Sequence, residues 1–257
     1  MIANYHTHTY RCGHAVGSEE DYINMALNRR MKILGFSDHT PQIYPNGFQS
    51  HIRMLPEQLA GYCKNLTKLQ QQYAGEIEIH IGLEAEYYPK LWKDLLGLLS
   101  DQSVEYLILG QHWAENEMEE PYIGRPTEDE SLLQRYCDRV LDALQTGCFS
   151  YIAHPDVIHF VGDDAVYKSH IRRLCQGAKS CDIPLEINFG GLRANAHYPN
   201  RLFWEIAAEE NCRAVFGIDA HAPEQILDIQ AQRIASAMAE ELGLRVDPYV
   251  ELRPIHP

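Results

Sequence analysis

The chain has 257 residues and a formal net charge of −14 at pH 7, with 45% hydrophobic and 23% charged residues. This length and composition fit one large globular domain, and the acidic balance disfavours a nucleic-acid surface. No apolar run approaches the length of about 18 residues that a membrane span requires, and no basic and apolar leader opens the chain. We therefore expect one domain over residues 1–257, with 245–257 as an unassigned tail, in a cytoplasmic monomer or small homo-oligomer.

Short β-like runs alternate with helical segments along the chain, as in a parallel α/β fold. Strands are predicted at 2–8, 32–37, 77–84, 106–112, 151–154, 185–188 and 213–217. Helices are predicted at 18–30, with Ser18 as N-cap, and at 56–73, 90–99, 129–144, 165–180, 201–210 and 223–242. This alternation gives seven β/α units, but by itself it does not separate a closed barrel from an open doubly wound sheet.

The run 77–84 has the clearest period of two. Ile77, Ile79, Ile81 and Leu83 alternate with other residues, so the aliphatic side chains share one face and Glu84 lies on the other. If helices cover the outside of a barrel, Glu84 points to its interior. The acidic segment 114–127 has the turn residues of a loop that covers a site.

The seven cysteines are scattered and include no Cys-x-x-Cys pair. An odd number without such spacing argues against a disulfide framework and against a thiolate zinc site. Cys12 lies inside a histidine cluster, where it can be a ligand or a nucleophile, although a small packing residue is the favoured interpretation.

Residue types that bind metals recur at the carboxyl ends of the predicted strands. His6 and His8 are two apart in a strand and therefore face the same way. The complete set of candidates is His6, His8, His14, His39, Glu84, His112, His154, Asp219 and His221. Each histidine alone could equally be a hydrogen-bonded core residue. Their shared position at the edge where (β/α) barrels build active sites favours a metal centre.

These candidates are too many for one catalytic zinc ion, which takes three protein ligands. Two or three divalent ions are implied, and the histidine-rich set favours zinc, manganese or iron over magnesium or calcium. Three such ions would leave positive charge at the mouth of an acidic protein, which suits a phosphate dianion. Because metal ions lower the pKa of water to about 7 and neutralise phosphoryl oxygens, this pattern favours hydrolysis of a small phosphate ester.

Several motifs spread over nearly the whole chain contain the candidate ligands. They are His6-Thr7-His8-Thr9 with Cys12-Gly13-His14-Ala15, Gly35-Phe36-Ser37-Asp38-His39, Gly82-Leu83-Glu84, Gly110-Gln111-His112-Trp113, Ala153-His154-Pro155-Asp156 and Asp219-Ala220-His221. Together these motifs resemble the PHP (polymerase and histidinol phosphatase) superfamily. The resemblance implies a single-domain, distorted (β/α)7 barrel with a trinuclear metal site.

By position, the resemblance also implies three ligand sets. They are His6, His8, Glu84 and Asp219 for one ion, His14, His39 and His221 for a second, and Glu84, His112 and His154 for a third, with Glu84 bridging. The three divalent ions are expected to be zinc, with iron or manganese as alternatives.

Other features are similar to the monofunctional histidinol-phosphate phosphatases of histidine biosynthesis. They are the Cys-x-His-Ala ending of the first motif, Ser37-Asp38-His39 before Pro41, and Glu186-Ile187-Asn188 leading to Gly191-Leu192-Arg193. Arg193 matches an arginine expected to clamp the substrate phosphate, for which a guanidinium fork is suited; the alternative is a surface ion pair. The extra Gly190 and the acidic segment 115–120 depart from the pattern.

The expected mechanism is attack on phosphorus by a metal-bound hydroxide, with Glu84 bridging the metals and Arg193 holding phosphoryl oxygens. Asp156, His159 and His197 are candidate proton donors to the leaving group, of which we choose Asp156. Carboxylates that could receive the ammonium group of histidinol are found in the acidic segment, at Glu115, Glu117 and Glu119.

Two alternatives remain open. One is a PHP hydrolase of another phosphoester, such as a general monoester, a nucleotide or phosphotyrosine. The other is a metal-binding module without catalysis. Kinetic comparison of these substrates separates the phosphatases, and elemental analysis with a p-nitrophenyl phosphate assay identifies an inactive module.

Overall fold

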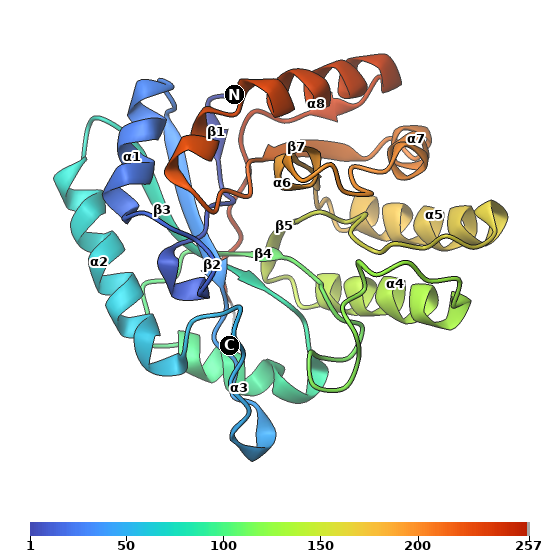
Figure 1. The fold of residues 1–257 in the computed structure, drawn as a ribbon, viewed down its shortest axis with the longest axis horizontal. Coiled ribbons are helices and arrows are strands. Elements are labelled where there is room, and N and C mark those ends of the chain that lie inside the picture. The colour runs from blue at the N-terminus through green and yellow to red at the C-terminus, as the bar shows by residue number, and fades with distance from the viewer. Residues whose placement is uncertain (256–257) are drawn as a thin grey trace.

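The computed structural model describes residues 1–255, and one parallel sheet of eight strands runs through them in sequence order (Figure 1). The strands are β1 (Ala3–Asn4), β2 (Ile33–His39), β3 (Glu78–Ala85), β4 (Tyr106–Leu109), β5 (Phe149–Ile152), β6 (Leu185–Asn188), β7 (Arg213–Gly217) and β8 (Arg245–Val246). The sheet curls and helices cover its outer face, which confirms the predicted distorted α/β barrel. Positions 256 and 257 of the predicted tail lie outside the described residues.

The helices follow the predicted order with small changes at their ends. The α-helices are α1 (Glu19–Asn28), α2 (Leu59–Gln72), α3 (Pro89–Leu99), α4 (Glu130–Gln145), α5 (Asp164–Ser180), α6 (Phe189–Arg193), α7 (Arg201–Glu209) and α8 (Ile229–Leu242). The 3-10 helices are η1 (Tyr10–Cys12), η2 (Pro45–Gly47), η3 (Pro56–Gln58) and η4 (Pro223–Leu227). No helix among residues 1–255 combines the length and apolar character needed to cross a membrane.

Side-chain caps explain where two of the helices begin. Ser18 accepts from the backbone N–H of Asp21 and forms a capping box with it, which confirms Ser18 as the N-cap of α1. The helix predicted over 223–242 is instead divided, because the Asp228 side chain accepts from Ala231 N and starts α8 there. The five-residue α6 was not predicted, since it is too short for a hydrophobic period.

The sheet has one strand more than the seven predicted. β8 lies in the segment that the sequence left unassigned, and it pairs with β7 through Arg213–Arg245 and Ala214–Val246. Two paired residues are too few for a period of two to be visible in the sequence. The seven predicted β/α units are therefore present, and a short eighth strand extends the sheet.

The sheet order does not pair β1 with β8, yet the chain closes at the carboxyl end of the strands. A parallel bridge joins Thr7 to Ala220, and the N–H of His8 donates to the Ala220 carbonyl at 2.9 Å. Below it, the N–H of Ile218 donates to the Asn4 side chain at 2.9 Å. These contacts bring the segments after β1 and β7 together at the rim, which is where most of the candidate ligands lie.

Two apolar layers lie on opposite faces of the sheet. The larger core, between sheet and helices, includes the aliphatic residues of β3, from Ile79 to Leu83, together with Trp204. The smaller core fills the barrel interior and includes Tyr106, Tyr151 and Ile108. The alternation predicted for β3 is thus confirmed, because Glu84 lies on the interior face beneath the rim.

Tyr106 fills the floor of the interior because two glycines leave room for its ring. A Cβ atom on Gly82 would lie 2.2 Å from Tyr106 ring carbons, and one on Gly35 would lie 2.2 Å from its hydroxyl oxygen. The hydroxyl donates to the carbonyls of Tyr5 at 2.8 Å and Phe36 at 3.2 Å. The ring therefore ties three strand regions together beneath the rim.

We predict that Gly82→Ala destabilises the fold by about 1–3 kcal/mol, because the added methyl group overpacks the Tyr106 ring. Gly97→Ala is the matched control: Gly97 lies in α3, and a methyl group added there would have no other atom within 4 Å, so alanine should stabilise by about 0.5–1 kcal/mol. Urea denaturation of both variants measures the free energies of unfolding. A Gly82→Ala protein as stable as the wild type would contradict this close packing.

Candidate metal centre

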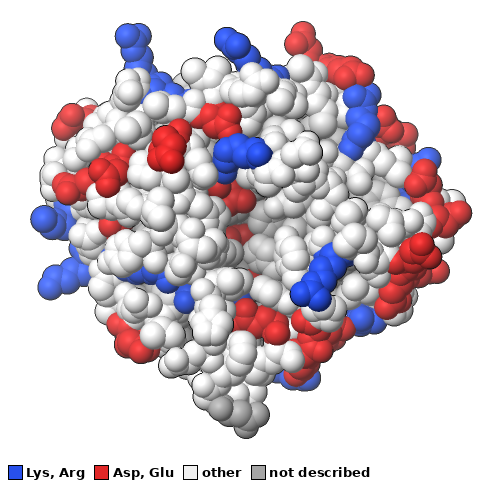
Figure 2. All heavy atoms as spheres, in the orientation of Figure 1, with Lys and Arg blue, Asp and Glu red and all other residues white. Residues whose placement is uncertain are grey.

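A cavity of about 320 Å³ opens at the carboxyl ends of the strands. It is lined by His8, His14, His39, Ile52, Glu84, His112, Trp113, Tyr122, His154, Tyr198, Asp219 and His221. Figure 2 shows the corresponding hollow at the centre of this face, with acidic side chains visible inside it. The cavity is therefore floored by the residues that the sequence singled out as ligands.

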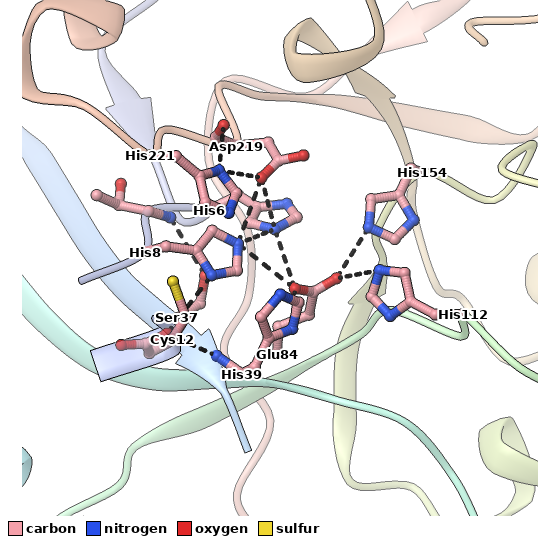
Figure 3. A network of polar contacts seen from close by, with 12 residues as sticks. His6, His8, Cys12, Ser37, His39, Glu84, His112, His154, Asp219 and His221 are labelled. Atoms are coloured by element: carbon pink, nitrogen blue, oxygen red, sulfur yellow. Dashed lines mark hydrogen bonds and ion pairs between the residues drawn. The ribbon is translucent and has the colours of Figure 1, made fainter. Parts of the chain in front are cut away.

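Different strands supply these ligands. His39 is the last residue of β2 and Glu84 lies in β3, whereas His112 and His154 follow β4 and β5. The remaining candidates come from the segments after β1 and β7, which the Thr7–Ala220 bridge joins. The structure thus brings together all of the predicted ligand residues, and Figure 3 labels all of them except His14.

A first group surrounds one carboxylate oxygen each of Glu84 and Asp219. His6 Nε2 lies 3.6 Å from Glu84 Oε2 and 3.6 Å from Asp219 Oδ1. His8 Nε2 lies 3.4 Å from Glu84 Oε2 and 3.3 Å from Asp219 Oδ1. The nitrogen atoms of the two histidines are 3.2 Å apart. Two imidazoles and two carboxylates therefore converge on one point.

A second group contains His14, His39 and His221. One potential ligand atom of each residue lies within 4.8 Å of those of the other two. The Cys12 sulfur also lies within 4.8 Å of nitrogen atoms of His8 and His221. Its role as a sulfur ligand therefore remains a prediction, as does the alternative role of a packing residue.

A third group lies on the other oxygen of Glu84. His154 Nε2 is 2.8 Å from Glu84 Oε1, and His112 Nε2 is 3.5 Å from the same atom. Figure 3 shows Glu84 between the His6–His8 pair and the His112–His154 pair. The two oxygens of one buried carboxylate, only 1% exposed, therefore face two different groups.

Hydrogen bonds from the Nδ1 atoms of three histidines orient their Nε2 atoms toward the ligand groups. His6 Nδ1 donates to Glu186 at 2.8 Å, His112 Nδ1 donates to Glu86 at 2.9 Å, and His14 Nδ1 donates to the Cys12 carbonyl at 2.9 Å. Because these partners only accept, the Nε2 atom of each neutral ring carries the lone pair.

Several buried atoms of the cluster lack a hydrogen-bond partner among the described residues. They include His221 Nε2, and also Glu84 Oε2 and His39 Nδ1, which lie 3.0 Å apart without hydrogen-bond geometry. A buried acceptor without a donor is costly, whereas a cation would satisfy several of these lone pairs at once. The donor set therefore fits divalent metal ions.

The pKa values of two histidines in the cluster are shifted in opposite directions. Burial alone would lower the pKa of His6, but Glu186, Asp219 and Glu84 raise it to about 10. Burial lowers the pKa of His39 to about 4 despite the nearby Glu84. Protons and metal ions compete for such nitrogens, so metal binding near neutral pH should release a proton from His6, whereas His39 is already neutral.

Sequence reasoning missed the carboxylates that hold these histidines. Glu186 is fully buried, and its Oε2 accepts from His154 N at 3.0 Å and Asn188 Nδ2 at 2.8 Å, in addition to the bond from His6 to Oε1. Glu86 could have been found from its spacing, since it lies two residues after Glu84 and so on the same face of the strand. Such carboxylates fix ring orientation and raise ligand basicity.

Asp38 is a third supporting carboxylate. The Thr9 hydroxyl and the Thr9 N–H both donate to its Oδ2, and its Oδ1 lies 3.6 Å from His8 Nδ1. In the sequence it appeared only as the neighbour of His39.

Arg53 connects Glu86, the carboxylate that holds His112, to the surface loops. Its guanidinium donates to Glu86 at 2.8 and 3.1 Å, to the Thr40 carbonyl at 3.2 Å and to Glu117 at 3.3 Å. Although burial raises it, Arg53 and His112 lower the pKa of Glu86 to about 2. A charged carboxylate therefore remains available to hold His112.

Two ligand candidates have unusual backbone conformations. His154 has φ of +28° and Asp219 has φ of +50°, a region that costs non-glycine residues about 1–3 kcal/mol. Such conformations concentrate at functional sites, where the surrounding structure enforces them. The bond from His154 N to Glu186 contributes to that enforcement.

The other predicted site residues lie outside the cavity lining. Arg193, in α6, donates to the Asp219 carbonyl at 2.7 Å and lies 3.4 Å from Asp228. Asp156 is fully buried, and its Oδ2 accepts from Asn200 N at 2.6 Å and Trp204 Nε1 at 3.0 Å. Their proposed roles stay predictions.

The glutamates expected to receive an ammonium group are also outside the lining. Glu117 accepts from Ser50 and Arg53, Glu115 pairs with Arg139, and Glu119 is exposed. Of the described residues that line the cavity, only Glu84 and Asp219 are carboxylates.

Comparison with known proteins gives consistent matches. The family model of the PHP domain matches residues 4–189. A probable histidinol-phosphatase from Deinococcus radiodurans is 30% identical over 237 residues, covering 88% of each chain. A second probable histidinol-phosphatase, from Schizosaccharomyces pombe, is 26% identical and covers 88% of this chain and 82% of its own.

A solved structure shows the same fold. It is histidinol phosphate phosphatase from Lactococcus lactis in complex with zinc, L-histidinol and phosphate. The TM-score is 0.71 at 18% identity, and the match covers 95% of both chains.

We predict that Glu186→Gln weakens metal binding by about 10–100-fold, the range for loss of such a partner. A glutamine amide has one accepting oxygen, so it cannot accept from both His6 and the donors on the other side. Equilibrium dialysis with a competing chelator, followed by elemental analysis, measures the affinity. The exposed Glu128→Gln is the control, and equal affinities of the two variants would contradict the supporting role of Glu186.

Proposed function

Because the chain belongs to the PHP domain family, we propose that it is a metal-dependent phosphomonoesterase that converts L-histidinol phosphate and water to L-histidinol and phosphate. The observation that carries this proposal is the convergence of histidines from several strands on both oxygens of Glu84. The relatives with the same fold and the same kind of activity in their names support the choice of substrate.

We propose that the three groups hold three divalent ions, with zinc preferred and iron or manganese as alternatives. The first group is His6, His8, Glu84 and Asp219, the second is His14, His39 and His221, and the third is Glu84, His112 and His154. When bound, such ions acidify water and neutralise phosphoryl oxygens. The protein contributes the fixed ring orientations and, through Glu84, a link between the groups.

Arg193 is the proposed clamp for the phosphate. The Asp219 carbonyl and Asp228 hold part of its guanidinium, which fixes the side chain beside the rim. Its remaining N–H groups donate to no other residue among those that the structure describes. A fixed, planar fork binds two phosphoryl oxygens at once. Arg193 would therefore hold the phosphate next to the Asp219 side of the cluster.

Asp156 is the proposed proton donor to the leaving group. Burial raises the pKa of its carboxyl to about 6, so a protonated fraction exists near neutral pH. Its Oδ2 is held by Asn200 and Trp204, whereas Oδ1 has no hydrogen-bond partner among the described residues. Comparison of Asp156→Asn on alkyl and p-nitrophenyl phosphates tests this role, because only the alkyl leaving group needs the proton.

We predict that the metal-loaded protein hydrolyses L-histidinol phosphate with a kcat/KM at least about 10²-fold above that for p-nitrophenyl phosphate, nucleoside monophosphates or a phosphotyrosine peptide. Chelation should abolish the activity, and Glu84→Gln should lower kcat on the order of 10³-fold, since metal-supplied stabilisation amounts to several kcal/mol. Comparable rates on all substrates would instead identify a general phosphatase. Metal binding without turnover would identify an inactive module.

We predict that Arg193→Lys raises KM and the inhibition constant of inorganic phosphate about tenfold, because lysine keeps the charge but loses the fork. Asp228→Asn is the control, since it removes the ion-pair partner and leaves the guanidinium. Steady-state kinetics with phosphate as inhibitor measures both constants. An unchanged inhibition constant in Arg193→Lys would show that the residue only anchors the Asp219 loop.

A further inference from the structure

One wall of the cavity consists of aromatic side chains that are not metal-ligand candidates. It contains Trp113, Tyr122 and Tyr198, and we call these three residues the aromatic wall. The ring centroids of Trp113 and Tyr122 are 6.1 Å apart, and Tyr122 lies 6.3 Å from the His112 ring. Tyr198 lies 6.1 Å from the His154 ring. The aromatic wall therefore stands beside the third ligand group.

Two glycines leave space for the rings of Tyr122 and Tyr198. A Cβ atom on Gly124 would lie 2.3 Å from the Tyr122 ring, and one on Gly191 would lie 2.5 Å from the Tyr198 ring. The Trp113 carbonyl accepts from Gln111 Nε2 at 2.6 Å, which fixes the backbone at that position. A binding surface whose side chains are already in place loses little conformational entropy when a ligand arrives.

The hydroxyl groups of the wall differ from those of the structural tyrosines. Tyr62, Tyr106 and Tyr136 each donate to a backbone carbonyl in the interior. Neither Tyr122 nor Tyr198 makes a side-chain hydrogen bond to any residue in the described part of the chain. Both therefore retain polar groups and ring surface for a ligand.

The chemistry of the lining restricts what this wall can recognise. The carboxylates in the lining belong to the ligand groups, and the acidic loop that follows Trp113 turns Glu117 toward Arg53 instead. A positively charged leaving group therefore meets aromatic side chains rather than a free carboxylate. The electron-rich faces of tryptophan and tyrosine attract cations, and they also pack against flat rings.

We propose that the aromatic wall binds the leaving group of the substrate and selects an alcohol that carries an ammonium group next to a planar ring. This inference rests on the proposed function, in which the phosphate lies at the ligand groups. With the phosphate held there, the remainder of the substrate must lie along the part of the lining that is not ligand, which is the aromatic wall and Ile52. The wall thus supplies the selectivity that the glutamates of the acidic loop do not.

Three substrates separate the charge from the ring. L-histidinol phosphate has both the ammonium group and an imidazole, L-phenylalaninol phosphate keeps the ammonium group beside a phenyl ring, and 3-phenylpropyl phosphate has only the phenyl ring. In the metal-loaded wild type, we expect kcat/KM for L-phenylalaninol phosphate to exceed that for 3-phenylpropyl phosphate by about tenfold or more, as a partly desolvated cation–π contact predicts.

Trp113→Leu is the decisive variant, and we expect it to reduce this charge preference to about threefold or less, because leucine keeps apolar volume and removes the aromatic face. Tyr249→Leu, an exposed tyrosine outside the cavity lining, is the matched control and should keep the wild-type preference. A preference that is unchanged in Trp113→Leu overturns the proposal, as does a wild type that favours the uncharged substrate.

Calorimetry supplies a readout that does not depend on turnover. L-phenylalaninol and 3-phenylpropan-1-ol are titrated into the metal-loaded protein in the presence of inorganic phosphate, and the charged alcohol should bind at least about tenfold more tightly in wild type but not in Trp113→Leu. If the protein hydrolyses none of the phosphates, the proposed function fails, and calorimetry still tests whether the aromatic wall prefers the charged alcohol. If it hydrolyses them without preference for charge, the wall inference fails and the phosphatase remains.

Discussion

A single buried carboxylate determines how the rim is organised. Glu84 is 1% exposed, and its two oxygens face histidines that reach the rim from different strands. An isolated charge in this position would carry a large desolvation penalty; the surrounding imidazoles lower the pKa of Glu84 well below its usual range although burial opposes them. Gly110 permits the arrangement, because a Cβ atom there would lie 1.8 Å from Glu84 Oε1.

Further buried carboxylates lie behind the histidine rings of this cluster. Glu186 and Glu86 accept hydrogen bonds from the Nδ1 atoms of His6 and His112, which fixes the orientation of both rings and leaves one lone pair on each. Asp38 lies 3.6 Å from His8 Nδ1 and places a further negative charge behind that ring. Arg53 balances the charge of Glu86 and at the same time holds the loop that contains Glu117. The position of His112 and the path of the outer loop are consequently linked through one buried guanidinium.

The site divides its tasks between charged and aromatic surfaces. The imidazoles and carboxylates lie where strands converge, and the proposed phosphate clamp Arg193 stands beside them on α6. The aromatic wall comes from the loops after β4 and α6. Catalytic groups on the rigid ends of the strands and selectivity on the loops are the usual division in such barrels.

The local pattern of the sequence predicts the alternation of strands and helices, the inward direction of Glu84 and the set of metal-ligand candidates, because period-two patterns and strand-end positions are local properties of the chain. It could not show β8, whose two residues are too few to form a pattern, nor the short α6. Three contacts became visible only in the folded chain: Thr7 meets Ala220, Glu186 holds His6 across the barrel, and Glu117 turns to Arg53 rather than to the cavity. These contacts join residues far apart in sequence, and nothing in the local residue pattern specifies which distant partner a buried charge will find.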